Sequence, residues 1–190
     1  SNSEFILSAL NKYRIEKAKA ECFVENGLSE GNEIILLGRR LKIRLIKAME
    51  ERVVIDDKYV TLCLADTENY SNRLKILEVE LNRMREIFFK SAVDKFYPVF
   101  KSFGVEYPMI VIKNSVSRWG YCQPLRSTIM MNKQLICVPE ALMDYLALHE
   151  LTHFLYPNHS AEFWNFAEQL MPDCRARRKD LQQYSFLLKN

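Results

Sequence analysis

All three histidines of this chain lie between positions 149 and 159. His149 and His153 form the two ends of an H-E-x-x-H pattern, with Glu150 second, on a stretch predicted to be helical. Residues four apart share one face of a helix, with Cβ atoms about 6 Å apart, so both imidazoles can bind one ion at the roughly 2.0–2.1 Å of zinc–nitrogen bonds. Glu150 is rotated by about 100° from His149, which places its carboxylate beside the ion. The pattern therefore predicts a metal site with an acid/base group next to it.

A third ligand is expected shortly after the helix. His159 follows His153 by six residues and comes just after Pro157, which stops a helix. Three nitrogen ligands and one open position are typical of a catalytic zinc site. A carboxylate could replace His159: Glu162 and Glu168 lie 9 and 15 residues beyond His153, and the longer spacing of Glu168 would suit a ligand on the following helix. Two other interpretations stay open, namely unrelated histidines on a helix face and a structural metal with a fourth Cys or Asp ligand.

The chemistry of such a site is hydrolysis. Zinc lowers the pKa of its water toward ~7 and polarises a scissile carbonyl. We expect Glu150 to take the water proton and to return it to the leaving group. The developing oxyanion needs a further donor, for which Arg118 is the first candidate by charge, although a surface or packing role suits it equally well.

The elements that must position these residues follow from periodicity. The expected elements are an amphipathic helix at 4–26, an antiparallel meander of short strands at 33–65, a long core helix at 69–102 ended by Gly104, strands at 107–113, 117–122 and 127–132, the H-E-x-x-H helix from 140 to 156, a helix capped by Ser160 that runs to 170, and a last helix from 172. Strands followed by helices indicate an α+β domain.

Composition excludes some classes of protein and leaves many others. The chain has 190 residues, 48% hydrophobic and 27% charged, which suits one globular domain and argues against disorder. No apolar run approaches the ~18 residues of a membrane span, and no signal peptide is evident, so we expect a cytoplasmic protein. Five scattered cysteines without a C-x-x-C pattern indicate reduced thiols.

The sequence resembles the YgjP-like metal-dependent hydrolases, which are related to the SprT-like zinc metallopeptidases. The matching segments are S-R-W-G-Y-C at 117–122, I-M-M-N at 129–132 with Leu135-Ile136, and H-E-L-T-H-F-L-Y-P-N-H-S-A-E-F-W at 149–164. Met171-Pro172-Asp173 with Arg177-Arg178 fits the family's ending. The resemblance covers residues 31–182, so residues 1–30 are interpreted as an N-terminal helical extension and 31–190 as the metallohydrolase domain. Tyr121 departs from the family, which usually has a small Ser there.

This resemblance implies a zincin-like α+β fold. It implies zinc held by His149, His153 and His159, with Glu150 as the catalytic acid/base, and it favours His159 over Glu168 as the third ligand. Zincins generally align an extended substrate on an edge strand, which here is expected at 127–132.

The activity predicted from these observations is that of a metallopeptidase, but three alternatives stay open. The same site could act on a phosphoanhydride or a small amide, since Lys113, Arg118 and Arg126 are near in sequence. The cations of 175–179 could contact nucleic acid, although an exposed helix face and a net charge of +3 argue against that partner. An inactive scaffold is disfavoured because Glu150 is intact.

Overall fold

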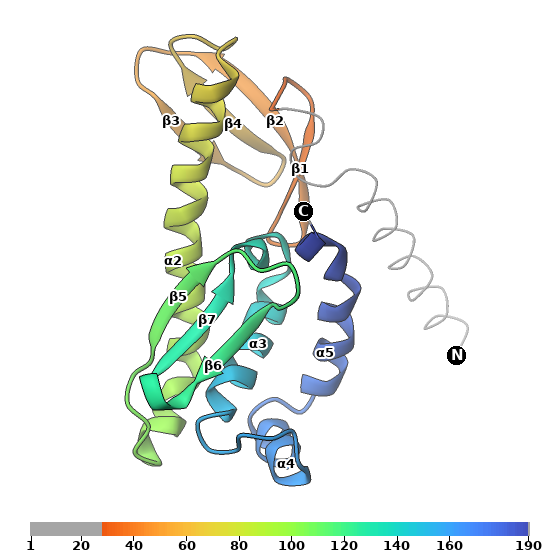
Figure 1. Ribbon diagram of the computed structural model, residues 1–190. Helices are drawn as coiled ribbons and strands as arrows, with labels where there is room; N and C mark the ends of the chain where they lie inside the picture. Colours follow the sequence, from red (N-terminus) through yellow and green to blue (C-terminus); the bar gives the residue numbers. More distant parts are fainter. Residues whose placement is uncertain (1–27, 190) are drawn as a thin grey trace, which may run out of the picture. The chain divides into compact units, whose positions relative to one another are not determined.

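The computed structural model describes residues 28–189, so the helix expected at 4–26 lies outside the described residues. The chain divides into two compact units, Ser1–Glu80 and Leu81–Asn190, with the boundary inside α2 (Tyr70–Ser102). The first unit holds a sheet, and the second holds another sheet with several helices (Figure 1). This mixture confirms the expected α+β class. The predicted division of the chain after residue 30 stays a prediction.

The first sheet has the strand order β1-β2-β4-β3. Its strands are β1 (Glu33–Leu36), β2 (Arg39–Lys47), β3 (Arg52–Ile55) and β4 (Tyr59–Leu64). β1 pairs with β2 and β3 with β4 in antiparallel fashion, but β2 and β4 are parallel. The expected antiparallel meander is therefore wrong at this pair. β4 is buried from Val60 to Leu64, and so apolar a strand is stabilised most at the centre of a sheet, between β2 and β3.

The second sheet has three strands in the order β5-β7-β6 (Figure 1). The strands are β5 (Met109–Lys113), β6 (Gly120–Gln123) and β7 (Thr128–Asn132). β7 runs parallel to β5 and antiparallel to β6. The segment expected as an edge strand is thus the central one, because four of its residues, Ile129–Asn132, are buried. β6, which is only half-buried, lies at one edge.

Helices and short 3₁₀ segments complete the second unit. They are η1 (Pro124–Arg126), η2 (Lys133–Cys137), α3 (Glu140–Thr152), α4 (Ala161–Leu170), α5 (Cys174–Gln183) and η3 (Ser185–Lys189). α3 contacts β6, α4 and α5, and it is apolar around most of its circumference, as expected of a helix at the centre of a core. Ser160 caps α4 as predicted, its hydroxyl accepting from the Phe163 amide.

α3 ends earlier than the sequence pattern indicated. Its last residue is Thr152, whereas the apolar pattern continued to Tyr156. His153 is the C-cap, with φ −66° and ψ −15°, so the helical spacing from His149 is preserved. Tight turns then follow, in which the amides of Leu155 and Tyr156 both donate to the carbonyl of Thr152. These turns redirect the chain before Pro157.

Two whole-chain expectations can be compared with the described part. Cys63, Cys122, Cys137 and Cys174 are free thiols, as predicted, while Cys22 falls outside the described residues. Within residues 28–189, no helix has both the length and the apolar character needed to cross a membrane.

Candidate active site

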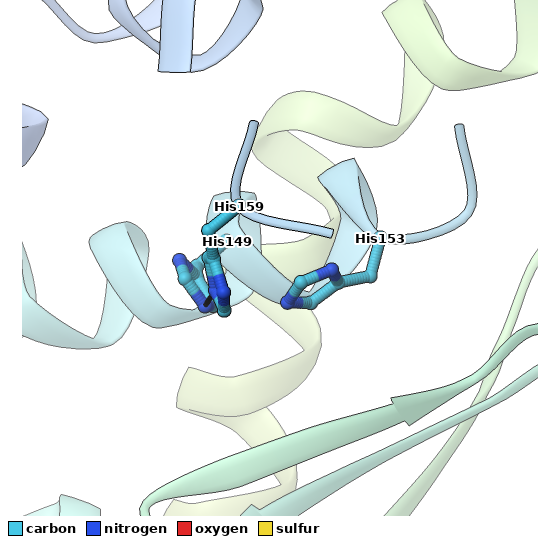
Figure 2. Close-up of side chains that lie close together, drawn as sticks. All are labelled: His149, His153 and His159. Carbon is cyan, nitrogen blue, oxygen red and sulfur yellow. Dashed lines mark hydrogen bonds between the residues drawn. The ribbon is translucent and has the colours of Figure 1, made fainter. Parts of the chain in front are cut away.

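The three histidines of the sequence pattern converge in space. One nitrogen atom each from His149, His153 and His159 lie within 4.8 Å of one another. The Nε2 atoms of His149 and His159 are 2.9 Å apart. Figure 2 shows the rings of His149 and His153 extending from one helix, while His159 reaches the same point from the chain beyond it. The turns after α3 therefore bring the third imidazole back to the first two.

A buried phenylalanine supports all three rings. Phe163, on the first turns of α4, is 0% exposed. Its ring centroid lies 5.0 Å from that of His149 and 4.8 Å from those of His153 and His159. An aromatic ring at these distances packs against each imidazole and limits its rotation. Sequence reasoning did not place Phe163 in the site, although its position four residues after His159 was a usable signal.

Hydrogen bonds orient two of the imidazoles. Nδ1 of His149 lies 3.3 Å from the Tyr145 hydroxyl, and Nδ1 of His153 lies 3.1 Å from the carbonyl oxygen of Tyr156. The tautomer in which each Nδ1–H donates to its oxygen leaves the Nε2 lone pair available for an ion. Such partners fix ring orientation in metal sites. Tyr145 stands one helical turn before His149, a spacing that could have identified it.

The donor set fits a divalent metal ion. Tetrahedral zinc–nitrogen bonds of about 2.0–2.1 Å place two ligand nitrogens about 3.3–3.4 Å apart. The observed separations, 2.9 Å for one pair and 4.8 Å at most, bracket that value. Burial, followed by the neighbouring imidazoles, lowers the pKa of His149 to about 3. Burial also lowers the pKa of His153 and of His159. The rings are therefore neutral at pH 7, which is the form that binds metals.

Glu150 lies on the same helix but in a different environment. Its side chain is 4% exposed, and burial raises its pKa from the ordinary 4.5 to about 8, against the opposing effect of a hydrogen bond from the Cys122 amide. A carboxyl group that titrates near neutrality is suited to exchange protons with water and a leaving group. The amide comes from β6, so this edge strand holds the carboxylate.

Gly120 of β6 makes room for that carboxylate. A Cβ atom at this position would lie 3.0 Å from Oε1 of Glu150, 2.9 Å from the Met130 carbonyl oxygen and 3.2 Å from Leu146. Only glycine allows the strand to approach so closely. The sequence signal was a glycine inside a predicted strand, and sequence reasoning did not use it.

The loop before β6 is fastened by a buried amide. Asn132 is 0% exposed, and its Nδ2 donates to the carbonyl oxygens of Ser115 at 2.7 Å and Arg118 at 2.9 Å. Its Oδ1 accepts from the Gln134 amide. This network places the chain that leads into Gly120.

The remaining predicted candidates are Arg118, Glu162 and Glu168, and neither glutamate belongs to the group of described side chains that could hold an ion. Arg118 has an exposed side chain, and only its carbonyl makes one of the contacts above, so its oxyanion role stays a prediction. Glu168 pairs with Arg175, and the Glu162 carboxylate accepts from the Ser160 hydroxyl. Among the described residues, the group that can share an ion contains His159 and no fourth Cys, Asp or Glu.

Comparisons with known proteins identify the family of this chain. A family model described as "YgjP-like, metallopeptidase domain" matches residues 1–184 and thus also includes the first thirty residues. The crystal structure of the metallopeptidase zymogen of Methanocaldococcus jannaschii jannalysin is similar, with 24% identity and a TM-score of 0.44, over 50% of this chain and 94% of that one. No curated protein matches. Because the family model covers nearly the whole sequence, this chain belongs to the YgjP-like metallopeptidase family.

Proposed function

We propose that this metallopeptidase uses zinc, held by His149, His153 and His159, and that Glu150 is its general acid/base. The observation that carries the proposal is the convergence of three imidazole nitrogens within 4.8 Å on neutral, oriented rings. A divalent metal is what the family implies, and three nitrogen ligands are the preference of zinc. The ion pair of Glu168 with Arg175 supports His159 as the third ligand.

The bound ion and the protein would divide the chemistry between them. When bound, zinc polarises the scissile carbonyl, lowers the pKa of water and favours the ionised form of a nearby carboxylate. Glu150 then accepts a proton from the attacking water and delivers it to the amine that leaves. The Cys122 amide and the space at Gly120 hold the carboxylate in place during both transfers.

We propose β6 as the strand that aligns the peptide. Strand 127–132 cannot serve, because both of its edges are paired with β5 and β6. β6 has one edge free within its sheet, contacts α3 and approaches Glu150. An extended peptide can add to such an edge through main-chain hydrogen bonds. Arg118, two residues before Gly120, stays the candidate donor to the oxyanion.

We also propose that the protein works in the cytoplasm. Its four described cysteines are free, and thiols persist in reducing compartments. Cell fractionation with an antibody against the full chain tests this, and recovery from an oxidising compartment would contradict it.

Metal analysis and a substrate panel test the enzymatic proposal. We expect purified protein to carry about one zinc per chain, to lose peptide hydrolysis on chelation and to regain it with zinc. A peptide library and a set of nucleoside triphosphates should be assayed side by side. Recovery with another divalent ion but not with zinc would overturn the choice of metal. Hydrolysis of nucleotides without any peptide cleavage would overturn the choice of substrate.

A further inference from the structure

The basic side chains at 175–179 differ in the groups that surround them. Arg175 pairs with Glu168 and lies 4.6 Å above the Trp164 ring. Arg177 pairs with Asp173 at 2.8 Å and donates to the Ala141 carbonyl oxygen at 3.1 Å. Carboxylates of the protein therefore neutralise both arginines. This arrangement does not suit a continuous surface for nucleic acid, which needs free cations in a row.

Arg178 differs from these two arginines because no carboxylate neutralises it. Its side chain is exposed, and among residues 28–189 no acidic group pairs with it. Its guanidinium carbon lies 5.2 Å from the centroid of the Trp164 ring. A cation at that distance from an indole is held by the negative face of the ring, which costs the guanidinium none of its hydrogen-bond donors.

Trp164 connects Arg178 with the histidine cluster. The indole is 6% exposed, and its ring lies 6.0 Å from that of His159 at an interplanar angle of 26°. The ring of His149 is 6.2 Å away. The guanidinium is thus an unneutralised cation at the border of the site.

An unneutralised arginine at this position suits an anionic part of a substrate. Guanidinium groups bind carboxylates through two parallel hydrogen bonds, which a point charge such as lysine cannot reproduce. An extended peptide advances by about 3.3–3.6 Å per residue. A carboxylate that reaches Arg178 would therefore lie about one to three residues from a bond cleaved at the histidines.

We propose that Arg178 is a specificity-determining residue that binds a carboxylate of the peptide substrate, within a few residues of the scissile bond. The carboxylate is either the peptide's C-terminus or an Asp or Glu side chain. This inference rests on the proposed peptidase function of the histidine site. In this proposal the Trp164 ring holds the guanidinium in place, and the N–H groups of Arg178 donate to the carboxylate.

A comparison of matched peptides tests the role of Arg178 in cleavage. A peptide that the zinc-loaded full chain cleaves is prepared with a free or amidated C-terminus, and with Glu or Gln at each of the three positions on either side of the bond. We expect one carboxylate form to be preferred about 10- to 100-fold in kcat/KM, as a charge-assisted hydrogen bond allows. The effective form shows which carboxylate is bound.

Variants assign that preference to one side chain. Arg178→Gln should reduce the carboxylate-to-amide ratio to about one, and Arg178→Lys should keep only part of it. Lys179→Gln is the matched control, because it removes the same charge from the next, exposed residue of α5 and should leave the ratio unchanged. An Arg178→Gln protein with the wild-type ratio, or a wild-type protein without any preference, would overturn the inference.

Binding without turnover separates this inference from the proposed function. The same peptide pairs are titrated into metal-free Glu150→Gln protein, and Trp164 fluorescence is followed in a Trp119→Phe background. The carboxylate form should bind more tightly, and the difference should shrink at high salt and vanish in Arg178→Gln. If no peptide is ever cleaved, the peptidase mechanism fails while this titration still decides the role of Arg178. Equal binding of both forms would exclude that role.

Discussion

Asp56 in the first unit and Glu150 in the second both accept hydrogen bonds from backbone amides, yet their pKa values move in opposite directions. Asp56 lies in the exposed β3–β4 turn, where the amides of Lys58 and Tyr59, at 2.7 and 2.8 Å, lower its pKa. Glu150 receives the Cys122 amide, but burial outweighs it and raises the pKa to about 8. The same hydrogen bond stabilises a charge at the surface and fails to compensate for lost water in a core.

The difference shows that the fold surrounds these two carboxylates differently, so that burial raises the pKa of Glu150 alone. The two sheets are built alike, each with one parallel pair and a buried central strand. Only the second places an edge strand with a glycine against a buried acidic side chain. Four predictions, ordered from the largest expected effect to the smallest, probe this contrast.

Replacing His153 should have the largest effect. His153→Ala removes one of the three proposed nitrogen ligands, so we expect loss of the metal and a fall in peptide hydrolysis of about 1,000-fold or more. Elemental analysis and a peptide assay measure the two quantities. The control is Asn158→Ala, which changes an exposed residue shortly after His153. This variant should keep its metal and its peptide hydrolysis. Full metal content in the His153 variant would remove that residue from the ligand set.

Glu150→Gln should separate chemistry from metal binding. We expect the variant to keep about one zinc per chain, while kcat falls about 10²- to 10⁴-fold through loss of the proton acceptor. Elemental analysis and steady-state kinetics measure the two effects. Unchanged kcat would contradict the role of Glu150, and loss of the zinc would show that the carboxylate holds the ion.

In metal-free protein, Glu150 and Asp56 should change the free energy of unfolding in opposite directions as the pH rises. Because burial raises the pKa of Glu150 from 4.5 to about 8, the folded state binds the extra proton, so its contribution to the free energy of unfolding should fall as pH rises across that window. Glu150→Gln should remove this fall and be more stable than wild type above pH 8, by about 2–5 kcal/mol.

Asp56 provides the reverse case in the same measurement. Its lowered pKa means that its stabilising contribution is present above the ordinary value of 3.8 and is lost as pH falls further. Asp56→Asn should therefore be slightly less stable than wild type near neutral pH, and this difference should disappear in acid. Urea unfolding of Glu150→Gln, Asp56→Asn and wild type at several pH values measures these differences. If the two variants differed from wild type with the same dependence on pH, the opposite pKa shifts of Glu150 and Asp56 would be refuted.

Gly120→Ala should have the smallest effect of the four. The added methyl group pushes against Oε1 of Glu150 and the Met130 carbonyl, so we expect about a tenfold loss of kcat with the metal retained. Gly104→Ala is the control, since its φ of +81° makes alanine strained where nothing lies within 4 Å. That change should cost about 1 kcal/mol of stability and no activity.

Much of the site could be predicted because its signals are local. H-E-x-x-H spacing depends only on helix geometry, which the C-cap conformation of His153 preserves even though α3 ends at Thr152. The long helix was predicted at 69–102 and is found at Tyr70–Ser102, because a 3,4-spaced apolar row specifies one face over its whole length. The cap of α4 at Ser160 was predicted for a similar reason.

The order of strands depends on contacts far apart in the chain and was not predictable in this way. Both β4 and β7 are central because each is the most buried strand of its sheet, a property of the packed sheet rather than of each segment. The same holds for Phe163 beneath the imidazoles and for Arg178 above Trp164.

The amino-acid sequence by itself determined that His149 and His153 can share an ion with Glu150 beside them, because helix geometry sets the spacing of these three residues. Only the turns after α3 decided that His159 joins them. Only the tertiary structure decided the state of Glu150, because its pKa depends on how completely β6 and the core exclude water from the carboxylate. It also decided which arginine of this pair is held by a carboxylate and which lies near the Trp164 ring, since helical spacing alone does not distinguish Arg177 from Arg178.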